Sequence, residues 1–279
     1  MPKLSIITIN LNNKDGLVNT AKSVVTQTWT DYEWIIIDGG STDGSVDVIK
    51  EYAEKTDKLV YWCSEPDGGI YQGMNKGIAK ANGEYCWFLN SGDCAYKNTT
   101  LEEIFANEFD EDIIKGILVM EKKGQDYNEI WDSAFHISRS QRKLPVSDKE
   151  TRGPIYWVSE TLPHQATFTK TAFMRKLGCF DLEGDVGFFM FAMVKNNATV
   201  KYLPLKFAFF EDCGVSNSAG FAKKSKERRI RLYKKYFLLP YWFYKILSSI
   251  IIGKLSFWRK TYERTFTPIK EGKYARNAF

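Results

Sequence analysis

Short apolar runs and segments of helical period alternate along the first 120 residues. Apolar runs bounded by turn residues predict strands, and apolar positions three and four apart predict helices. The predicted strands are 4–9, 34–37, 58–63, 85–89 and 113–120, and the predicted helices between them are 15–26, 41–53 and 70–81. This β-α-β order predicts an α/β fold, with a doubly wound, mostly parallel sheet and right-handed crossovers.

The pattern changes in the second half of the chain. Residues 121–160 are polar and irregular, which indicates a long loop or an insertion. Apolar patterning resumes at 165–169, and helices are predicted near 170–177 and 185–194. Residues 222–264 are basic, aromatic and helical in pattern, with a break at Pro240. We therefore expect one α/β domain over 1–220, with halves of about 1–120 and 121–220, and a helical extension over 221–279.

Composition and charge narrow the class of protein. Hydrophobic residues make up 44% of the chain, with only 8 Pro and 20 Gly, which excludes a disordered or collagen-like protein. Residues 221–279 carry 16 Lys and Arg against 3 acids, whereas residues 1–220 carry 23 against 31. Such a basic tail on an acidic body predicts an anionic partner for the tail, either a membrane surface or a nucleic acid.

The cysteines and the first residues both predict a cytoplasmic protein. Five cysteines, with no C-x-x-C pair, are typical of buried thiols in a reducing compartment. The apolar run at the start is short and lacks the cleavage site of a secretory signal.

Polar residues follow the predicted strands, where α/β sheets bind their ligands. Asn10 ends the first strand, Asp38-Gly-Gly-Ser the second, Glu65-Pro-Asp67 the third and Asn90-Ser-Gly-Asp93 the fourth. One aspartate in such a place can be a helix cap, an interpretation that suits Asp43 best. Carboxylates after three strands instead predict an acidic cleft for Mg²⁺ or Mn²⁺ together with substrate phosphates.

Several ligand and enzyme classes lack their motifs. The chain contains no G-x-G-x-x-G after the first strand and no G-x-x-x-x-G-K-[ST], which argues against a dinucleotide-binding domain and a P-loop hydrolase. With two histidines and no H-E-x-x-H or G-x-S-x-G, a zinc protease or an α/β-hydrolase is also disfavoured.

Four segments together resemble family 2 glycosyltransferases, which have the GT-A fold. They are Ser5-Ile-Ile-Thr-Ile-Asn, Ile35-Ile-Ile-Asp-Gly-Gly-Ser-Thr-Asp-Gly-Ser, Ser64-Glu-Pro-Asp-Gly-Gly-Ile-Tyr-Gln-Gly-Met-Asn-Lys-Gly and Phe88-Leu-Asn-Ser-Gly-Asp. The last is most similar to colanic-acid-type bacterial transferases. The likeness extends over about 3–216, through Pro163-His-Gln-Ala-Thr-Phe and Gly178-Cys-Phe-Asp.

The resemblance implies a role for individual residues. Asp185 matches the catalytic base of inverting members, which removes the proton of an acceptor hydroxyl. Asp93 matches a ligand of the divalent cation, Mn²⁺ or Mg²⁺, and His164 lies on the acceptor side. The implied nucleotide contacts are Thr8, Asn10, Asp38, Asp67 and Asn90. The implied reaction is transfer from a nucleotide-sugar, with UDP-sugar favoured, to a hydroxyl of a glycan or lipid-linked acceptor in bacterial surface polysaccharide synthesis.

Alternatives remain open for the chain and for two of these residues. Asp93 is the one acid of its motif and Met74 replaces a phosphate-binding arginine, so a sugar-nucleotide-binding protein with weakened catalysis is the second hypothesis. A nucleic-acid-binding protein that uses its basic tail is the third. Asp185 could be the N-cap of the helix that follows it, and His164 a hydrogen-bonded histidine of the sheet edge.

The charge and apolar pattern of the tail predict where in the cell the protein acts. Basic clusters flank residues 236–253, which contain the single charge of Lys245. Because a central lysine costs about 2.5–3.5 kcal/mol in a bilayer and Pro240 interrupts the helix, an interfacial helix pair is favoured over a span. We expect residues 223–262 to bind anionic lipid at the inner face of the cytoplasmic membrane. The alternative is a self-packed helix or a contact between two copies of the chain.

Overall fold

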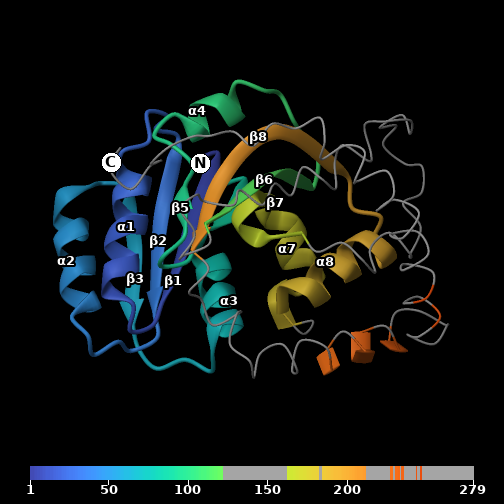
Figure 1. Ribbon diagram of the computed structural model, residues 1–279, viewed down its shortest axis with the longest axis horizontal. Helices are drawn as coiled ribbons and strands as arrows, with labels where there is room; N and C mark the ends of the chain where they lie inside the picture. The colour runs from blue at the N-terminus through green and yellow to red at the C-terminus, as the bar shows by residue number, and fades with distance from the viewer. Residues whose placement is uncertain are drawn as a thin grey trace.

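The computed structural model describes residues 1–121, 162–181 and 184–211, together with residues 227, 228, 230–232, 234, 235, 243 and 246 of the C-terminal segment. The described strands form one sheet, in the order β3-β2-β1-β4-β7-β6-β8-β5 (Figure 1). The strands are β1 (Leu4–Asn10), β2 (Tyr32–Asp38), β3 (Leu59–Ser64), β4 (Tyr85–Phe88), β5 (Cys94–Ala95), β6 (Ile113–Glu121), β7 (Thr167–Lys170) and β8 (Val200–Glu211).

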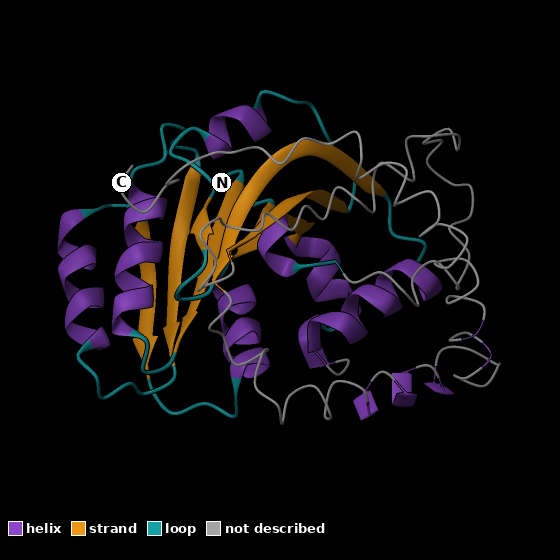
Figure 2. Cartoon of the chain, viewed as in Figure 1, coloured by secondary structure: helices purple, strands orange, loops and turns teal. Residues whose placement is uncertain are grey.

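Helices lie on both faces of this sheet (Figure 2). The helices are α1 (Lys14–Val25), α2 (Ser45–Lys55), α3 (Ile70–Lys80), α4 (Thr100–Phe105), α7 (Thr171–Leu177) and α8 (Gly184–Lys195), with 3₁₀ turns η1 (His164–Ala166) and η2 (Cys179–Asp181). Buried residues of α1, α2 and α4 share one core cluster, and those of α3, α7 and α8 share the other. The predicted α/β architecture with helices around the sheet is confirmed.

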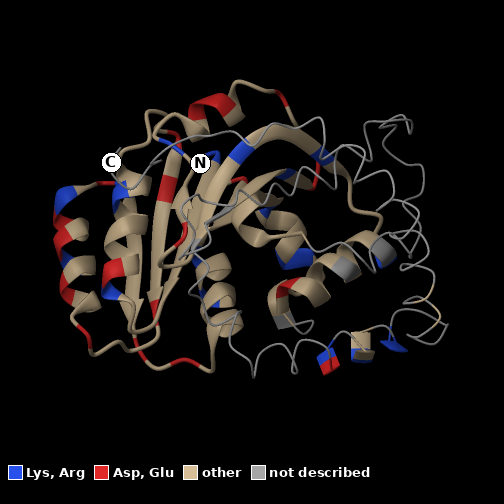
Figure 3. Ribbon diagram, in the orientation of Figure 1, with Lys and Arg blue, Asp and Glu red and all other residues tan. Residues whose placement is uncertain are grey.

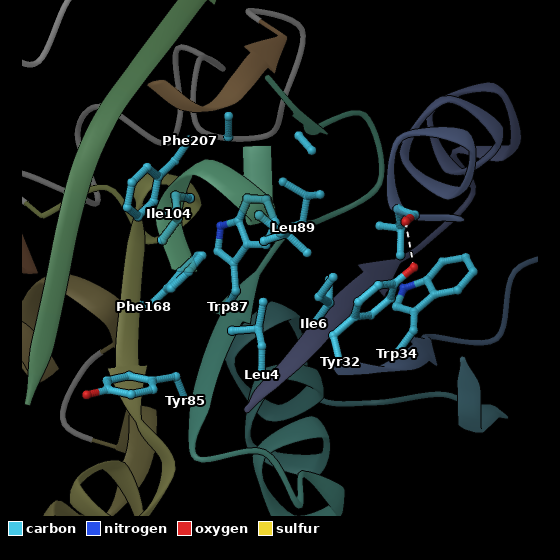
Figure 4. Close-up of a cluster of buried hydrophobic side chains, with 14 of the residues drawn as sticks. Leu4, Ile6, Tyr32, Trp34, Tyr85, Trp87, Leu89, Ile104, Phe168 and Phe207 are labelled. Atoms are coloured by element: carbon cyan, nitrogen blue, oxygen red, sulfur yellow. Dashed lines mark hydrogen bonds between the residues drawn. The ribbon is translucent and has the colours of Figure 1, made fainter. Parts of the chain in front are cut away.

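Strand β1 provides side chains to both clusters because successive residues of a strand point to opposite faces. Leu4 and Ile6 belong to the first cluster, and Ile7 and Ile9 to the second. Figure 4 shows the first, in which large aromatic side chains pack around β1 and β4. Trp34 and Trp87 within it have no exposed surface. Each such side chain contributes roughly 1.5–3 kcal/mol through its burial, so this cluster holds the central strands rigidly.

The sheet is mixed and mostly parallel, as expected: four of the seven pairs of described strands are parallel. β1 pairs in parallel with β2 and β4, and β2 with β3. β7 is antiparallel to both β4 and β6, and β5 is antiparallel to β8, whereas β6 and β8 are parallel. A short apolar run has the same pattern in either direction, so the pattern could not reveal that β7 runs against its neighbours.

The sequence pattern also missed three elements. β5 has two residues and α4 has six, so each is too short to develop a period. β8 has twelve residues, but Lys201, Pro204 and Lys206 interrupt its apolar pattern. The polar region 121–160 falls, apart from Glu121, outside the described residues, and the domain boundary near 220 lies outside them too.

Parts of the C-terminal segment are described. Residues 227, 228, 230–232, 234 and 235 are helical, as are 243 and 246. Leu232 has no exposed surface, whereas Ile246 is half exposed. Among the residues that the structure describes, no helix combines the length and apolar character that a membrane crossing requires.

Candidate functional site

The carboxyl ends of β1 and β2 lie side by side and bring two predicted site residues together. Asn10 is the register partner of Asp38, and its Nδ2 donates a hydrogen bond to Asp38 Oδ1 at 2.7 Å. The backbone amides of Gly40 and Ser41 donate to Asp38 Oδ2 at 3.1 and 2.8 Å. The hydroxyls of Ser41 and Ser64 donate to Oδ1 and Oδ2 at 2.5 and 2.6 Å. Asp38 thus organises the turn that follows β2.

The Asp38 carboxylate is enclosed and ionised. It has no exposed surface. Burial by itself raises the pKa of Asp38, but the hydrogen bonds from Ser41, Ser64 and Asn10 together lower that pKa below its ordinary value. Since all of these donors come from the protein, the carboxylate fixes its neighbours rather than facing an open cleft.

Asn10 carries a buried acceptor with no partner. Its Nδ2 donates to Asp38 and also lies 3.2 Å from Ser41 Oγ, whereas its Oδ1 lacks a hydrogen bond within the part of the chain that the structure describes. Leaving a buried polar atom unpaired costs about 1–3 kcal/mol. Oδ1 of Asn10 is therefore an atom that a hydrogen-bond donor of a ligand would satisfy.

Two glycines let the loops after β2 and β3 approach each other at this edge. A side-chain carbon at Gly39 would lie 3.3 Å from Leu11 Cδ1 and 3.6 Å from Asp67 Oδ2. Gly40 has a φ of +85°, and a side chain there would meet the backbone of Pro66 at 3.1 Å. Asp67 is half-buried, and its Oδ1 accepts a hydrogen bond from the amide of Gly69 at 2.8 Å. Asp67 thus lies beside the Asp38 turn, and its contact with a nucleotide stays a prediction.

Thr8 has a packing role. It has no exposed surface, and its hydroxyl accepts a hydrogen bond from Trp34 Nε1 at 3.0 Å. Its contact with a nucleotide stays a prediction. Met74, at the place of the expected arginine, is also fully buried and belongs to the second core cluster.

The turn after β4 is held by one hydroxyl of α1. Thr20 Oγ1 donates to the carbonyl of Asp93 at 2.7 Å and accepts from the amide of Gly92 at 3.0 Å. The amide of Asp93 donates to the carbonyl of Asn90 at 2.9 Å, which closes the turn. Gly92 has a φ of +101°, a left-handed conformation that favours glycine. The turn therefore has a defined shape, with Asp93 only 5% exposed.

Asp93 is the single metal ligand predicted from the sequence. Within residues 1–121, 162–181 and 184–211 and the described C-terminal positions, no group of three or more His, Cys, Asp and Glu could hold an ion. Mg²⁺ typically binds through one or two carboxylates plus the phosphates of a substrate. The donor set that the described residues offer fits an ion that the phosphates of a ligand help to coordinate.

Asp185 and His164, which are 21 residues apart, meet at the start of α8. His164 Nδ1 lies 3.2 Å from Asp185 Oδ2, and Asn90 Nδ2 lies 3.1 Å from His164 Nε2. A carboxylate only accepts hydrogen bonds, so His164 Nδ1 carries a proton and donates it to Asp185 Oδ2. Asn90, His164 and Asp185 thus form a hydrogen-bonded chain that links the turn after β4 to α8.

Two further donors meet the other oxygen of Asp185. Tyr71 Oη donates to Asp185 Oδ1 at 2.9 Å, and the amide of Val186 donates to the same oxygen at 2.8 Å. Burial raises the pKa of Asp185, but the His164 hydrogen bond and charge, with the donors Tyr71 and Val186, lower that pKa below its ordinary value. Asp185 lies within the first turn of α8, and an N-cap would accept from an amide two or three residues on, so helix capping explains none of these contacts. The side chain is 20% exposed, so an ionised carboxylate remains accessible.

The sequence motifs alone do not single out Tyr71 or Arg228. Arg228 Nη1 donates to Tyr71 Oη at 3.1 Å, and its guanidinium carbon lies 5.3 Å from the centre of the Tyr71 ring. Tyr71 stands within the third motif, and Arg228 within a basic cluster that was interpreted only as a surface for an anionic partner. Their shared contact with the Asp185 network appears only in the folded chain.

Comparison with known proteins places the chain in a family. Residues 5–159 match the sequence profile of Glycosyl transferase family 2. An uncharacterized glycosyltransferase of Mycobacterium tuberculosis is 34% identical over 187 residues, which are 65% of this chain and 64% of the relative. A PGL/p-HBAD biosynthesis glycosyltransferase of Mycobacterium bovis is 28% identical over 184 residues, again 65% and 64%. The match thus spans somewhat less than two thirds of these relatives' length.

Solved structures resemble the fold. S. aureus TarS 1–349 in complex with UDP-GlcNAc has a TM-score of 0.55 at 17% identity, covering 85% of this chain and 68% of that one. The mannosyltransferase PcManGT from Pyrobaculum calidifontis, in complex with GDP-Man and Mn²⁺, has a TM-score of 0.59 at 14% identity, covering 84% and 64%. With the four motifs at the ends of neighbouring strands, the chain belongs to glycosyl transferase family 2 and has the GT-A fold.

Proposed function

We propose that this protein is an inverting glycosyltransferase that moves a sugar from a nucleotide-sugar, UDP-sugar in the first place, to a hydroxyl of a glycan or lipid-linked acceptor. The observation that carries the proposal is the ionised, partly exposed carboxylate of Asp185, which is hydrogen-bonded through His164 to Asn90. Related folds that bind UDP-GlcNAc or GDP-Man support a nucleotide-sugar donor. A role in bacterial surface polysaccharide synthesis is part of the proposal.

The hydrogen bonds of Asp185 suggest which of its oxygens acts. Oδ1 accepts from Tyr71 and Val186, whereas Oδ2 accepts from His164. A carboxylate oxygen has two acceptor positions, so Oδ2 has room for the acceptor hydroxyl. As the hydroxyl oxygen bonds to the anomeric carbon, its proton passes to Oδ2 and the bond from that carbon to the diphosphate breaks. Attack opposite the leaving diphosphate inverts the configuration of the anomeric carbon.

The nucleotide would bind along the edge formed by the ends of β1, β2 and β4. The unpaired Oδ1 atoms of Asn10 and Asn90 are buried acceptors at two points of that edge. A base N–H would satisfy the first and a ribose hydroxyl the second, while Asp38 holds the turn beside Asn10. Asp67 would add a contact from the loop after β3.

Asp93 would hold Mn²⁺ or Mg²⁺ together with the phosphates of the donor. When bound, such an ion offsets the negative charge that builds on the departing diphosphate. A neighbouring fold in complex with GDP-Man and Mn²⁺ supports this part of the proposal.

A thermal-shift screen tests the donor and the ion together. UDP-, GDP- and dTDP-sugars are added with and without Mn²⁺, because a ligand at 100 times its Kd stabilises a protein by about 2.7 kcal/mol. UDP-sugars should raise the Tm most, and Mn²⁺ should enlarge the shift. In Asp93→Ala the Mn²⁺ contribution should vanish, while it persists in the matched control Asp47→Ala on the exposed face of α2.

Two results of the screen would contradict the proposal. If no nucleotide-sugar raises the Tm, the chain does not bind the proposed donor. A shift with neither transfer to an acceptor nor slow hydrolysis of the donor would favour a sugar-nucleotide-binding protein without catalysis.

We also propose that residues 223–262 attach the enzyme to an anionic membrane surface, at the inner face of the cytoplasmic membrane. The described C-terminal positions include Arg228, Arg231, Lys234 and Lys235 with the single acid Glu227, whereas α4 on the opposite side of the molecule carries Glu102 and Glu103 (Figure 3). Each basic residue near an anionic surface contributes about 1 kcal/mol. A lipid-linked acceptor would be found at that surface.

Co-sedimentation with vesicles that contain anionic lipid tests the attachment. Changing Lys223, Lys224 and Lys226 together to Gln should weaken binding by about 100-fold at low salt, since three contacts of about 1 kcal/mol are lost. Changing the exposed α2 residues Lys50 and Lys55 to Gln is the control and should leave binding unchanged. If the unchanged chain stays in the supernatant, the tail is a contact between protein surfaces, and sedimentation equilibrium then reports whether two copies associate.

A further inference from the structure

Arg228 fixes the direction of the only proton that Tyr71 can donate. A guanidinium donates hydrogen bonds and accepts none, whereas a phenol has one proton and accepts others. Arg228 Nη1 lies 3.1 Å from Tyr71 Oη, so Tyr71 is the acceptor in this contact. Its own proton is thereby left for Asp185 Oδ1, at 2.9 Å. The two contacts together point a donor at the base.

The start of α8 is shaped to admit the Tyr71 ring. Gly184 directly precedes Asp185 and has a φ of +84°. A side-chain carbon at Gly184 would lie 2.3 Å from Tyr71 Cζ, a distance at which one of them must move. Only glycine at residue 184 leaves the hydroxyl of Tyr71 beside Asp185, so the ring and the base are fitted to each other.

The C-terminal segment is anchored next to this contact. Arg228 and Leu232 are both helical and four residues apart, a spacing that puts them on one face of a helix. Leu232 has no exposed surface. The guanidinium of Arg228 lies over the Tyr71 ring, 5.3 Å from its centre, a cation–π arrangement. Burial of Leu232 therefore keeps Arg228 within reach of Tyr71.

We propose that Tyr71 and Arg228 are a positioning pair for Asp185, through which the basic C-terminal segment completes the catalytic site. The inference rests on the proposed transferase function and adds a residue from beyond the region that matches the family profile. Tyr71 holds the carboxylate so that Oδ2 faces the acceptor, and Arg228 acts through Tyr71. Neither residue is required to touch the donor.

A double-mutant cycle tests whether Arg228 acts through Tyr71. The variants are Tyr71→Phe, Arg228→Met and the double change, each measured for kcat and for the KM of the donor. Each single change should lower kcat by about 10-fold, because it removes one hydrogen bond of the series that runs from Arg228 through Tyr71 to the Asp185 carboxylate. The KM of the donor should not change. The double variant should fall within about 2-fold of Tyr71→Phe, because the effect of Arg228 disappears with its partner.

Two more variants separate positioning from a general loss of positive charge. Arg228→Lys keeps a donor for Tyr71 and should restore part of kcat. Lys50→Met removes an exposed cation from α2, outside the C-terminal segment, and should leave kcat unchanged. Thermal unfolding of every variant verifies that each is folded at the temperature of the assay.

Independent losses, about 100-fold in the double variant, would overturn the proposal, as would a raised donor KM in Arg228→Met. The second result would assign Arg228 to the diphosphate. If the unchanged chain transfers no sugar at all, the proposed function fails and the positioning role fails with it. Additive losses in an active enzyme overturn the positioning role alone, so the two failures are distinguishable.

Discussion

Replacing Asp185 with asparagine should lower sugar transfer by about 10²–10⁴-fold while donor binding survives. Asparagine keeps the size of the side chain but cannot take the proton of the acceptor hydroxyl. Rates at saturating donor and the Kd of UDP by calorimetry measure the two effects separately. Asp47→Asn, on the exposed face of α2, is the matched control and should transfer sugar at the rate of the unchanged chain.

The dependence of kcat on pH provides a second measurement of the same change. Because the hydrogen bonds of His164 and Tyr71 hold the pKa of Asp185 below the ordinary 3.8, the base is ionised throughout the neutral range. Activity that depends on this carboxylate is present above its pKa and is lost only as the pH falls through it. The corresponding acid limb should be absent in Asp185→Asn. If Asp185→Asn transfers sugar at a nearly normal rate, Asp185 is not the catalytic base and its role is structural.

Replacing Asp38 with alanine should weaken UDP binding by about 1.5–3 kcal/mol, which is roughly 10–150-fold in Kd. The loss has a structural cause, because the Asp38 carboxylate orients the amide of Asn10 and holds the turn through Ser41 and Ser64. Without it, Asn10 Oδ1 no longer keeps its direction toward a ligand. Calorimetry with UDP measures the change.

Two neighbouring variants locate the cause of that loss. Asn10→Ser removes the unpaired acceptor and should weaken UDP binding by itself, with the Asp38 turn retained. Asp43→Asn changes the next acid of the same loop, whose Oδ1 accepts the amide of Ser45 at the start of α2, and should leave the Kd of UDP unchanged. An unaltered Kd in Asp38→Ala would remove Asp38 and its turn from the donor site.

The sequence predicted the first half of the fold well because that half obeys one simple rule. Strands such as β1 and β2 are buried on both sides, so they appear as unbroken apolar runs that end in polar turns. From β7 onward the pattern no longer determines direction. The apolar pattern at 165–169 overlaps β7 but did not reveal that this segment is a strand antiparallel to β4.

The sequence named the residues of the candidate site but indicated few of the contacts between them. Asn10 and Asp38 follow adjacent strands, so their proximity was expected. The meeting of His164 with Asp185 depends on how η1 and α8 pack, which no local pattern encodes. Arg228 is 43 residues beyond Asp185 along the chain, and a basic residue in a basic cluster has no feature that distinguishes it from its neighbours.

Thr20 illustrates how a residue without chemistry of its own can influence affinity. Its hydroxyl bonds to both Gly92 and Asp93, so the turn that carries Asp93 is built onto α1 before any ligand arrives. A preorganised turn loses little conformational entropy on binding, and more of the interaction energy therefore appears as affinity. Stronger binding at the phosphate end of the proposed donor site would then require no new contact with the ligand. It would require keeping α1 packed against the sheet, where Leu17, Ala21 and Val24 are fully buried.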